Sequence, residues 1–245
     1  MSSEDWFESW FNTSYYHKLY AHRDDHEAQF FIKNVLGVLP INPQCKLLDL
    51  ACGRGRHSIF LSENNCDVIG LDLSEKNIEF AKSFETEKLK FEIGDMRENF
   101  GVQRFDYIFN LFTSFGYFQD KSDNSKACNS IHQALKPGGM LILDFMNVNK
   151  VKLGLVKKEI KRVEGLEFHI ERFIRDNKVI KKISFSDNSK DFNYEEQVQL
   201  LELSDFEELF EKSNLRIEKI YGDFNLQDFD PINSERLILF ASRKL

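Results

Sequence analysis

Cysteine, proline and tryptophan are scarce in this chain of 245 residues, which contains four, four and two of them respectively. The cysteines are scattered without the spacing of a metal site, at Cys45, Cys52, Cys66 and Cys128. Three of them fall in or near expected strands. We therefore expect buried free thiols rather than disulfides, and no bound metal.

The chain also lacks any apolar run long enough to span a membrane, and its first ten residues, MSSEDWFESW, do not have the charge pattern of a signal peptide. These absences predict a cytoplasmic protein with no membrane association. The length allows one large domain with a sizeable core.

An excess of positive charge is missing as well, because 33 lysines and arginines stand against 40 acidic residues, for a net charge of −7. This balance argues against a tight binder of nucleic-acid phosphates. Basic residues do gather between positions 150 and 162. Such a run is usually a solvated face, and the alternative is a collar for an anionic substrate.

The most informative segment is KLLDLACGRGRH, residues 46 to 57, followed by CDVIGLDLS. A short apolar strand ends near Asp49 and opens into a loop with Gly53 and Gly55, where glycine permits positive φ and close approach of a ligand. A second strand then delivers Asp72. In a parallel sheet both strand ends lie on the edge where α/β folds bind ligands, and a carboxylate there can accept hydrogen bonds from a ribose.

Two ligand classes suit this pattern, a dinucleotide and S-adenosylmethionine. The dinucleotide fingerprint requires Gly or Ala at a third position, which is Ser58 here. The loop instead resembles the first motif of class I S-adenosylmethionine-dependent methyltransferases. The residues at its positions are Asp49, Ala51, Cys52, Gly53 and Gly55, with Ala51 where the family often has glycine.

Three further segments follow in the order of that family: KFEIGDMRE, FDYIFNLFTSFGYF (105–118) and ALKPGGMLILDF (134–145). The resemblance implies that Asp72 holds the ribose, that Asp95 and Met96 hold adenine, and that Leu73 also belongs to the cofactor site. It also implies that the loop after the fourth strand lines the sulfonium side, through Asn110, Leu111, Phe112 and Ser114.

Alternating strands and helices predict a Rossmann-like α/β sandwich, with strands near 46–50, 66–72, 90–95, 105–110 and 139–146. We treat the chain as a single methyltransferase domain with a cofactor-binding core over 46–147. After this core, residues 204–245 are expected to form a helix and an antiparallel hairpin. The last strand would lie beside the fifth and complete a mostly parallel seven-stranded sheet. Ser204 and Glu207 have the spacing of a capping box.

Two segments extend the core. Residues 1–40 form an expected helical cap, whose aromatic residues either cover the sheet or lie over the cofactor cleft, and Arg23 could pair with the cofactor's carboxylate. Residues 156–202 alternate apolar and polar side chains, with turns at Asp176-Asn177 and Asp187-Asn188. This predicts an inserted antiparallel meander. The resemblance implies that this meander lines the acceptor pocket.

No residue is evident as a general base, and the candidates by position are Tyr16, His17, Tyr117 and His169. The Asn-Pro-Pro-aromatic motif and the Pro-Cys pair of nucleic-acid methyltransferases are absent. We therefore predict methyl transfer from S-adenosylmethionine to a small-molecule acceptor, with no nucleic-acid partner. The alternatives are a non-catalytic cofactor-binding or scaffold protein and, less favoured, an NAD-dependent oxidoreductase. The acceptor and the oligomeric state do not follow from the sequence.

Overall fold

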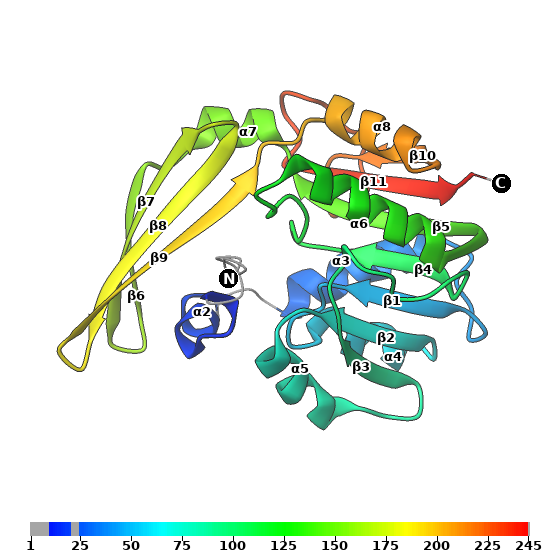
Figure 1. The fold of residues 1–245 in the computed structure, drawn as a ribbon, viewed down its shortest axis with the longest axis horizontal. Coiled ribbons are helices and arrows are strands. Elements are labelled where there is room, and N and C mark those ends of the chain that lie inside the picture. Colours follow the sequence, from blue (N-terminus) through cyan, green and yellow to red (C-terminus); the bar gives the residue numbers. More distant parts are fainter. Residues whose placement is uncertain (1–9, 21–24, 245) are drawn as a thin grey trace.

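The computed structural model describes residues 10–20 and 25–244. Its centre is a seven-stranded sheet in the order β10-β11-β5-β4-β1-β2-β3 (Figure 1). Strands β1 to β5 are parallel to one another, and β11 is antiparallel to both β5 and β10. The predicted Rossmann-like fold, with its antiparallel last strand beside the fifth, is confirmed.

The parallel strands are joined by helices in the order that the sequence pattern indicates. The elements are β1 (Lys46–Leu50), α4 (Arg56–Glu63), β2 (Asp67–Asp72), α5 (Glu75–Ala81), η1 (Lys82–Phe84), β3 (Leu89–Ile93), β4 (Phe105–Asn110), α6 (Lys121–Ala134) and β5 (Leu135–Met146). Strand order reverses between β1 and β4. A crevice forms at such a switch point because the adjoining connections leave in opposite directions.

Apolar side chains alternate across the sheet and make two cores. On one face, Leu48 and Ile108 pack with the aromatic residues Phe206 and Phe210 of α8 (Leu203–Lys212) and with α6. On the other face, Leu47 packs with α4, α5 and α3 (Asp25–Val38). The strands buried on both faces are typical of a parallel sheet covered by helices.

Two sequence predictions at the ends of elements were wrong. The capping box of α8 is Glu202 with Asp205, not Ser204 with Glu207, because the helix begins at Leu203. The fifth strand, expected from about residue 139, begins at Leu135 directly after α6 ends at Ala134, because Leu135 pairs with Phe105 of β4. β10 (Leu215–Tyr221) and β11 (Arg236–Arg243) then complete the sheet.

The inserted segment forms a second, four-stranded antiparallel sheet after α7 (Val148–Gly154). Its strands are β6 (Lys158–Val163), β7 (Leu166–Arg175), β8 (Lys178–Asp187) and β9 (Lys190–Gln199). Each hairpin turn has two residues at positive φ, the geometry that suits the twist of paired strands. The last turn is Asn188-Ser189, one residue beyond the predicted pair. The basic residues between positions 150 and 162 lie in α7, in β6 and in the connection between them.

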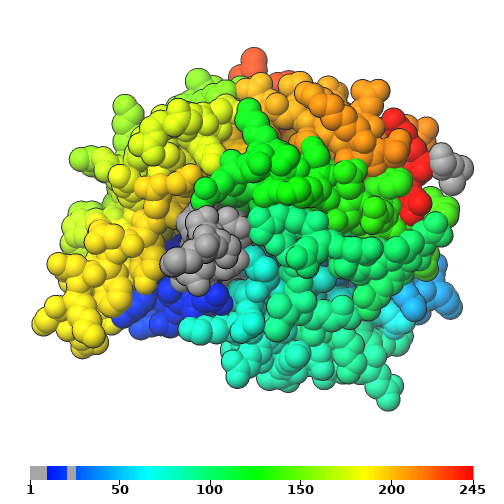
Figure 2. Space-filling view, in the orientation of Figure 1, coloured from blue at the N-terminus to red at the C-terminus, as the bar shows by residue number. Residues whose placement is uncertain are grey.

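Helix α2 (Ser14–Leu19) lies between the second sheet and the carboxyl ends of the core strands (Figure 1). Its N-cap is Thr13, and its buried residue Leu19 joins Trp10 against Phe168 and Phe185. In the space-filling view, the blue atoms of this segment lie against the yellow atoms of the second sheet (Figure 2). Within the described ranges, no helix is both long and apolar enough to cross a membrane.

Close packing around β2 yields a test of the core. A Cβ added to Gly70 would stand 2.6 Å from the Phe91 ring and 2.9 Å from the Cys52 sulfur. We expect Gly70→Ala to lower the free energy of unfolding by about 1–3 kcal/mol through overpacking.

Gly37→Ala is the matched control, because Gly37 is exposed in α3 with no atom within 4 Å of an added Cβ. There we expect a gain of up to about 1 kcal/mol from helix propensity. Urea unfolding measures both, and equal values for the two variants would contradict close packing at Gly70.

Candidate functional site

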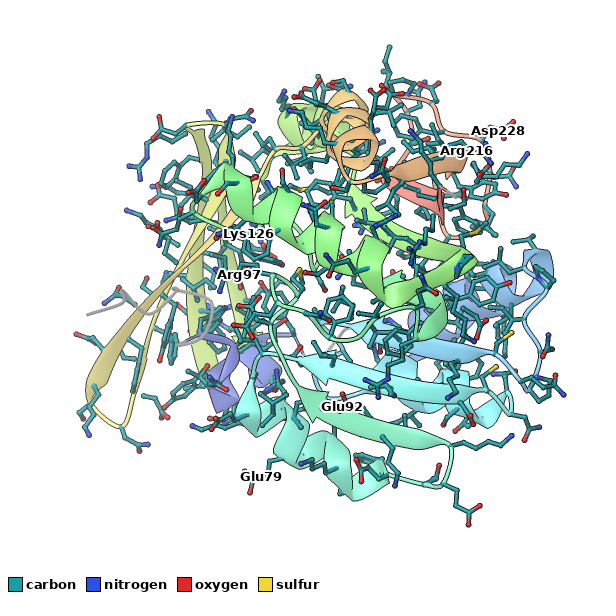
Figure 3. The ribbon with its side chains drawn as sticks, turned by 45° about the vertical axis from the view of Figure 1, so that its right-hand side comes forward. Glu79, Glu92, Arg97, Lys126, Arg216 and Asp228 are labelled. Carbon is teal, nitrogen blue, oxygen red and sulfur yellow. The ribbon has the colours of Figure 1, made fainter. Side chains whose placement is uncertain are left out.

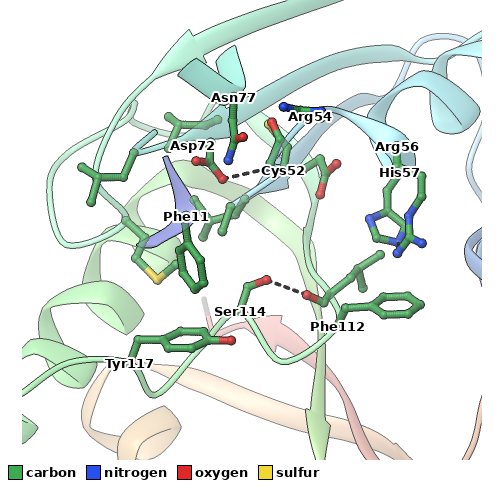
Figure 4. Close-up of a pocket in the computed structure, with 18 of the residues that line it drawn as sticks. Phe11, Cys52, Arg54, Arg56, His57, Asp72, Asn77, Phe112, Ser114 and Tyr117 are labelled. Carbon is green, nitrogen blue, oxygen red and sulfur yellow. Dashed lines mark hydrogen bonds between the residues drawn. The ribbon is translucent and has the colours of Figure 1, made fainter. Parts of the chain in front are cut away.

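A cavity of about 550 Å³ opens at the carboxyl ends of β1 to β4, at the switch point. Its walls come from the loops after these strands and from the α2 segment (Figure 4). Of the predicted cofactor residues, the cavity is lined by Asp49, Ala51, Cys52, Gly53, Asp72, Leu73, Asp95, Met96, Leu111, Phe112 and Ser114. The candidates Tyr16, His17 and Tyr117 also line it.

The glycine loop turns tightly between β1 and α4. Ala51, Gly53 and Gly55 all have positive φ, and the backbone N–H groups of Ala51 and Cys52 donate to the carbonyl oxygen of Leu71. An added Cβ at Gly53 would meet no atom within 4 Å, so the loop leaves room for a ligand there. Gly55 is different. It is the N-cap of α4, and an added Cβ would stand 2.6 Å from Phe91, so packing requires this glycine.

Asp72 ties two parts of the site together. Its carboxylate oxygens accept hydrogen bonds from the backbone N–H groups of Gly53 and Ser74, both at 2.8 Å. Burial raises the pKa of Asp72, and these N–H donors, with Asn77, oppose the rise. The carboxylate thus holds the glycine loop and the start of α5 while facing the cavity.

Asp49 lies behind the glycine loop and is almost completely buried. The Ser58 hydroxyl donates to its Oδ2 at 2.5 Å. Burial raises the pKa of Asp49 to about 6, against the opposing effect of the Ser58 hydrogen bond. Ser58, the position that argued against a dinucleotide, therefore donates a hydrogen bond to Asp49, the carboxylate of the first motif.

The end of β3 presents Asp95 and Met96. The Asp95 carboxylate accepts hydrogen bonds from the Arg97 guanidinium at 2.6–3.0 Å, and Arg97 also reaches Asp123 at 3.2 Å. Figure 3 shows Arg97 beside Lys126 of α6. No local pattern in the sequence indicates this pairing, which fixes Asp95 in the cavity wall.

At the end of β4, the prediction for Asn110 was wrong. Its side chain is completely buried and donates to the carbonyl oxygen of Leu50 at 3.0 Å, so it joins β4 to β1 instead of lining the cavity. The next residues do reach the cavity, and the Ser114 hydroxyl donates to the Leu111 carbonyl oxygen at 2.7 Å.

Aromatic side chains form one wall of the cavity, and we call this group the aromatic wall: Phe11, Tyr16, Tyr20 and Tyr117. The Phe11 ring lies 4.9 Å from that of Tyr16 and 5.6 Å from that of Tyr117. His17 lies near Asn77 and Arg54 at this end. Burial, with the charge of Arg54, lowers the pKa of His17 to about 4, so His17 is neutral at neutral pH.

Two predictions fall outside this cavity. His169 is more than half exposed, pairs with Glu167, and lines a separate hollow on the second sheet. No described residue of the inserted segment lines the main cavity, because Trp10, Tyr15 and Leu19 cover the apolar face of that sheet. Arg23 lies outside the described residues.

Several lining residues were missed. Arg54, Arg56 and His57 belong to the GRGRH segment, directly beside the motif glycines, and that adjacency was an available signal. Asn77 lies one helical turn beyond Asp72. Phe11 had no signal beyond the aromatic periodicity of the N-terminal segment. Among the described residues, no group of three His, Cys, Asp or Glu side chains could hold a metal ion.

The residues present fit an adenosyl ligand with an amino-acid tail. The carboxylate oxygens of Asp72 can accept hydrogen bonds from hydroxyl groups, the side chains of Leu73 and Met96 are apolar, and Gly53 leaves open space at the loop. The Asn77 Oδ1 atom is buried beside Asp72 with no hydrogen-bond partner within the described part of the chain, so a ligand donor can satisfy it. Fold and site together define a Rossmann-like enzyme that binds a nucleoside cofactor.

Comparison with known proteins is consistent with this class. Residues 41–214 match the family described as "Methyltransferase domain", and the chain belongs to that family. The predicted methyltransferase, with S-adenosylmethionine as its cofactor, is thereby confirmed.

Two curated relatives and one solved structure illustrate the likeness. A putative methyltransferase of Bacillus subtilis, YqeM, is 26% identical over 209 residues, which cover 81% of this chain and 84% of that protein. The dTDP-3-amino-3,4,6-trideoxy-alpha-D-glucopyranose N,N-dimethyltransferase of Streptomyces venezuelae is 25% identical over 184 residues, covering 72% and 77%. An S-adenosylmethionine-dependent methyltransferase of Clostridium acetobutylicum shares the fold with a TM-score of 0.77 and 21% identity, covering 94% and 96%.

Asp72 supplies the first test of the site. We expect Asp72→Ala to weaken binding of S-adenosylhomocysteine by about 1.5–3 kcal/mol, the range for hydrogen bonds to a charged group. The apo protein should also melt at a lower temperature, because two backbone N–H groups lose their acceptor. Asp67→Ala, at the exposed start of the same strand, should change neither quantity. Calorimetry that finds equal affinity in wild type and Asp72→Ala would remove Asp72 from the site.

The buried Asp49 carboxyl predicts a pH effect on stability. Its folded-state pKa of about 6 lies above the ordinary 3.8, so the folded state binds the proton more tightly than the unfolded chain. This contribution to stability is complete below the ordinary pKa and is lost as pH rises through the folded pKa. Relative to Asp49→Asn, the wild type should lose up to about 3 kcal/mol between pH 4 and pH 7. Urea unfolding across this range would refute the assignment if the two stability curves ran parallel.

Proposed function

We propose that this methyltransferase transfers the methyl group of S-adenosylmethionine to an amine nitrogen of a small-molecule acceptor, bound against the aromatic wall. The single observation that carries this proposal is the placement of Phe11, Tyr16, Tyr20 and Tyr117 along one side of the cavity. The relative from Streptomyces venezuelae, whose name describes an amino-sugar N,N-dimethyltransferase, supports an acceptor of this class.

The cofactor-binding roles follow the sheet. Asp72 accepts hydrogen bonds from the ribose, Asp95 and Met96 flank adenine with Leu73, and the loop of Ala51 and Gly53 borders the amino-acid half. Bound S-adenosylmethionine supplies a methyl group already activated for displacement. The task of the chain is to align the acceptor and exclude water, and alignment can account for about 7–11 kcal/mol of the barrier.

The charges around the cavity favour an amine at the aromatic wall. A methylated amine carries positive charge after transfer, and the faces of aromatic rings attract cations. Figure 4 shows Phe11 and Tyr117 on the opposite side of the cavity from Arg56 and His57. His17 is neutral at neutral pH, because its pKa is lowered to about 4, so it does not repel an ammonium group.

A neutral His17 also limits the choice of base. With a pKa of about 4 it is a weak proton acceptor, so its part is to orient an acceptor through a hydrogen bond. An amine that enters in its neutral form needs no strong base, since the nitrogen lone pair is already the nucleophile.

The second sheet affects the cavity indirectly, through its contacts with the N-terminal segment. Glu196 of β9 accepts hydrogen bonds from Trp10 Nε1 at 2.7 Å and from the Tyr20 hydroxyl at 2.6 Å, and so holds the aromatic wall in place.

The proposal is tested with matched acceptors. Purified protein should bind S-adenosylhomocysteine, and not NAD, in calorimetry. With radiolabelled S-adenosylmethionine, it should methylate small amino-sugars and amino acids but not analogues in which a hydroxyl replaces the amine. Transfer to the hydroxyl analogues alone would overturn the amine assignment, while binding of NAD without S-adenosylhomocysteine would overturn the cofactor assignment.

Two variants at Tyr117 separate the ring from its hydroxyl. We expect Tyr117→Leu to lower kcat/KM for an amine acceptor roughly tenfold, because a cation–π contact of about 1–2 kcal/mol forms as positive charge develops on the nitrogen. Tyr117→Phe keeps the ring and should remain within about threefold of wild type. Equal kcat/KM values for the Leu and Phe variants would show that the ring does not recognise the developing charge.

A further inference from the structure

A tight turn directly after β4 shapes one end of the cavity. Phe112 and Thr113 adopt φ values of 55° and 61°, so two consecutive non-glycine residues stand in the left-handed region. This conformation is uncommon for residues with a side chain, and it persists where surrounding contacts over-determine it. The contacts that hold this turn therefore matter for the cavity.

Those contacts converge on Asp144, a completely buried residue near the end of β5. Its Oδ2 accepts a hydrogen bond from the Phe112 backbone N–H at 2.8 Å, and its backbone carbonyl oxygen accepts from the Thr113 N–H at 3.0 Å. A side chain and a peptide group of one residue thus fix both residues of the turn.

Arg236, at the start of β11, completes the arrangement. Its Nε donates to Asp144 Oδ1 at 2.7 Å, and a terminal guanidinium nitrogen donates to Thr113 Oγ1 at 2.9 Å. Burial raises the pKa of Asp144, and the charge and hydrogen bond of Arg236 oppose that rise. The guanidinium therefore bridges the buried carboxylate to the turn, across 92 residues of chain.

The turn supports a cluster that faces the cavity. The Phe112 ring lies 4.9 Å from the His57 ring and 5.3 Å from the Phe224 ring, and the Arg56 guanidinium lies 4.8 Å from its centre. Phe112, His57 and Arg56 all line the cavity, on the side opposite Asp72 (Figure 4). A shift of the turn would move this end of the cavity and leave the Asp72 end in place.

The strand order identifies which part of the cofactor lies at this end. Asp72 and Asp95 follow β2 and β3, so the adenosine half lies over those strands under the proposed function. In the order β4-β1-β2-β3, an extended ligand that begins over β3 and β2 continues over β1 toward β4. The amino-acid half then lies beside Phe112 and Arg56.

We infer that Asp144 and Arg236 are positioning residues for the amino-acid half of the cofactor, which act by locking the Phe112-Thr113 turn. This inference rests on the proposed cofactor site. Neither residue lines the cavity, so their effect on the ligand passes through the turn and its cluster. The contacts of Asp72 and Asp95 with adenosine do not depend on the hydrogen bonds that Asp144 and Arg236 make to the turn.

The test compares two ligands that share adenosine. S-adenosylhomocysteine carries the amino-acid half, and 5′-methylthioadenosine lacks it. For Arg236→Met, we expect the calorimetric Kd of S-adenosylhomocysteine to rise at least tenfold and that of 5′-methylthioadenosine to stay within about twofold. Arg216→Met is the matched control, because Arg216 lies on the edge strand β10 in an exposed ion pair with Glu218 (Figure 3). It should change neither Kd.

Two more variants address two cases: that Arg236→Met does not fold, and that Arg236 acts only by stabilising the protein. If Arg236→Met does not fold, Asp144→Asn with Arg236→Met removes both charges and is measured in its place. Arg236→Lys keeps a positive charge near Asp144 but cannot reach both partners, so its melting temperature should recover while its affinity for S-adenosylhomocysteine remains reduced. Full recovery of affinity in Arg236→Lys would show that charge alone matters and would overturn the inference.

The remaining outcomes are also decisive. An equal rise of Kd for both ligands, or no rise for either, would overturn the positioning role and leave the cofactor site intact. A wild-type protein that bound neither ligand would overturn the proposed cofactor site itself, together with this inference.

Discussion

The reversal of strand order between β1 and β4 is the constraint on which the rest of the site depends. Because the crossovers are right-handed, chain segments leave the sheet in opposite directions at this point and a crevice remains. Every part of the cavity is arranged around it. The glycine loop and Asp72 border one side, and the Phe112-Thr113 turn borders the other. Asn110, although it does not face the cavity, joins the two strands through the Leu50 carbonyl oxygen.

Buried carboxylates hold the loops of this crevice in shape. Asp72 accepts two backbone N–H groups, Asp144 accepts one together with Arg236, and Asp49 accepts the Ser58 hydroxyl. Burial raises the pKa of each of these groups, and the hydrogen bonds oppose the rise. An unpaired buried charge is strongly unfavourable, so each carboxylate specifies the position of its donors. These hydrogen bonds thereby fix the conformation of the loops that border the cavity.

The second sheet contributes to the site through the N-terminal segment. Its apolar face packs on Trp10, Tyr15 and Leu19, and Glu196 fixes Trp10 and Tyr20. The Ser74 hydroxyl donates to Asn12 at 2.5 Å, which links the same segment to the start of α5. The α2 segment therefore contacts both the second sheet and the core, and presents its aromatic side chains to the cavity.

Local sequence determined the parallel core, because apolar runs, turn residues and the glycine loop act over a few neighbours. Ala51, Gly53, Asp72, Asp95 and Met96 could be placed at one sheet edge for that reason. The start of α8 and the Asn188-Ser189 turn deviated by one or two residues, and β5 begins about four residues before its expected start, since tertiary pairing selects among equivalent local signals.

Tertiary structure alone decided which side chains complete the cavity. The contacts of Arg236 with Asp144, of Glu196 with Tyr20 and of Arg97 with Asp123 join distant segments. His169 shows the converse, because strand alternation indicated a two-faced sheet but not which face meets the core. The sequence by itself determined the fold and the cofactor edge, whereas the aromatic wall depends on long-range packing that no local pattern encodes.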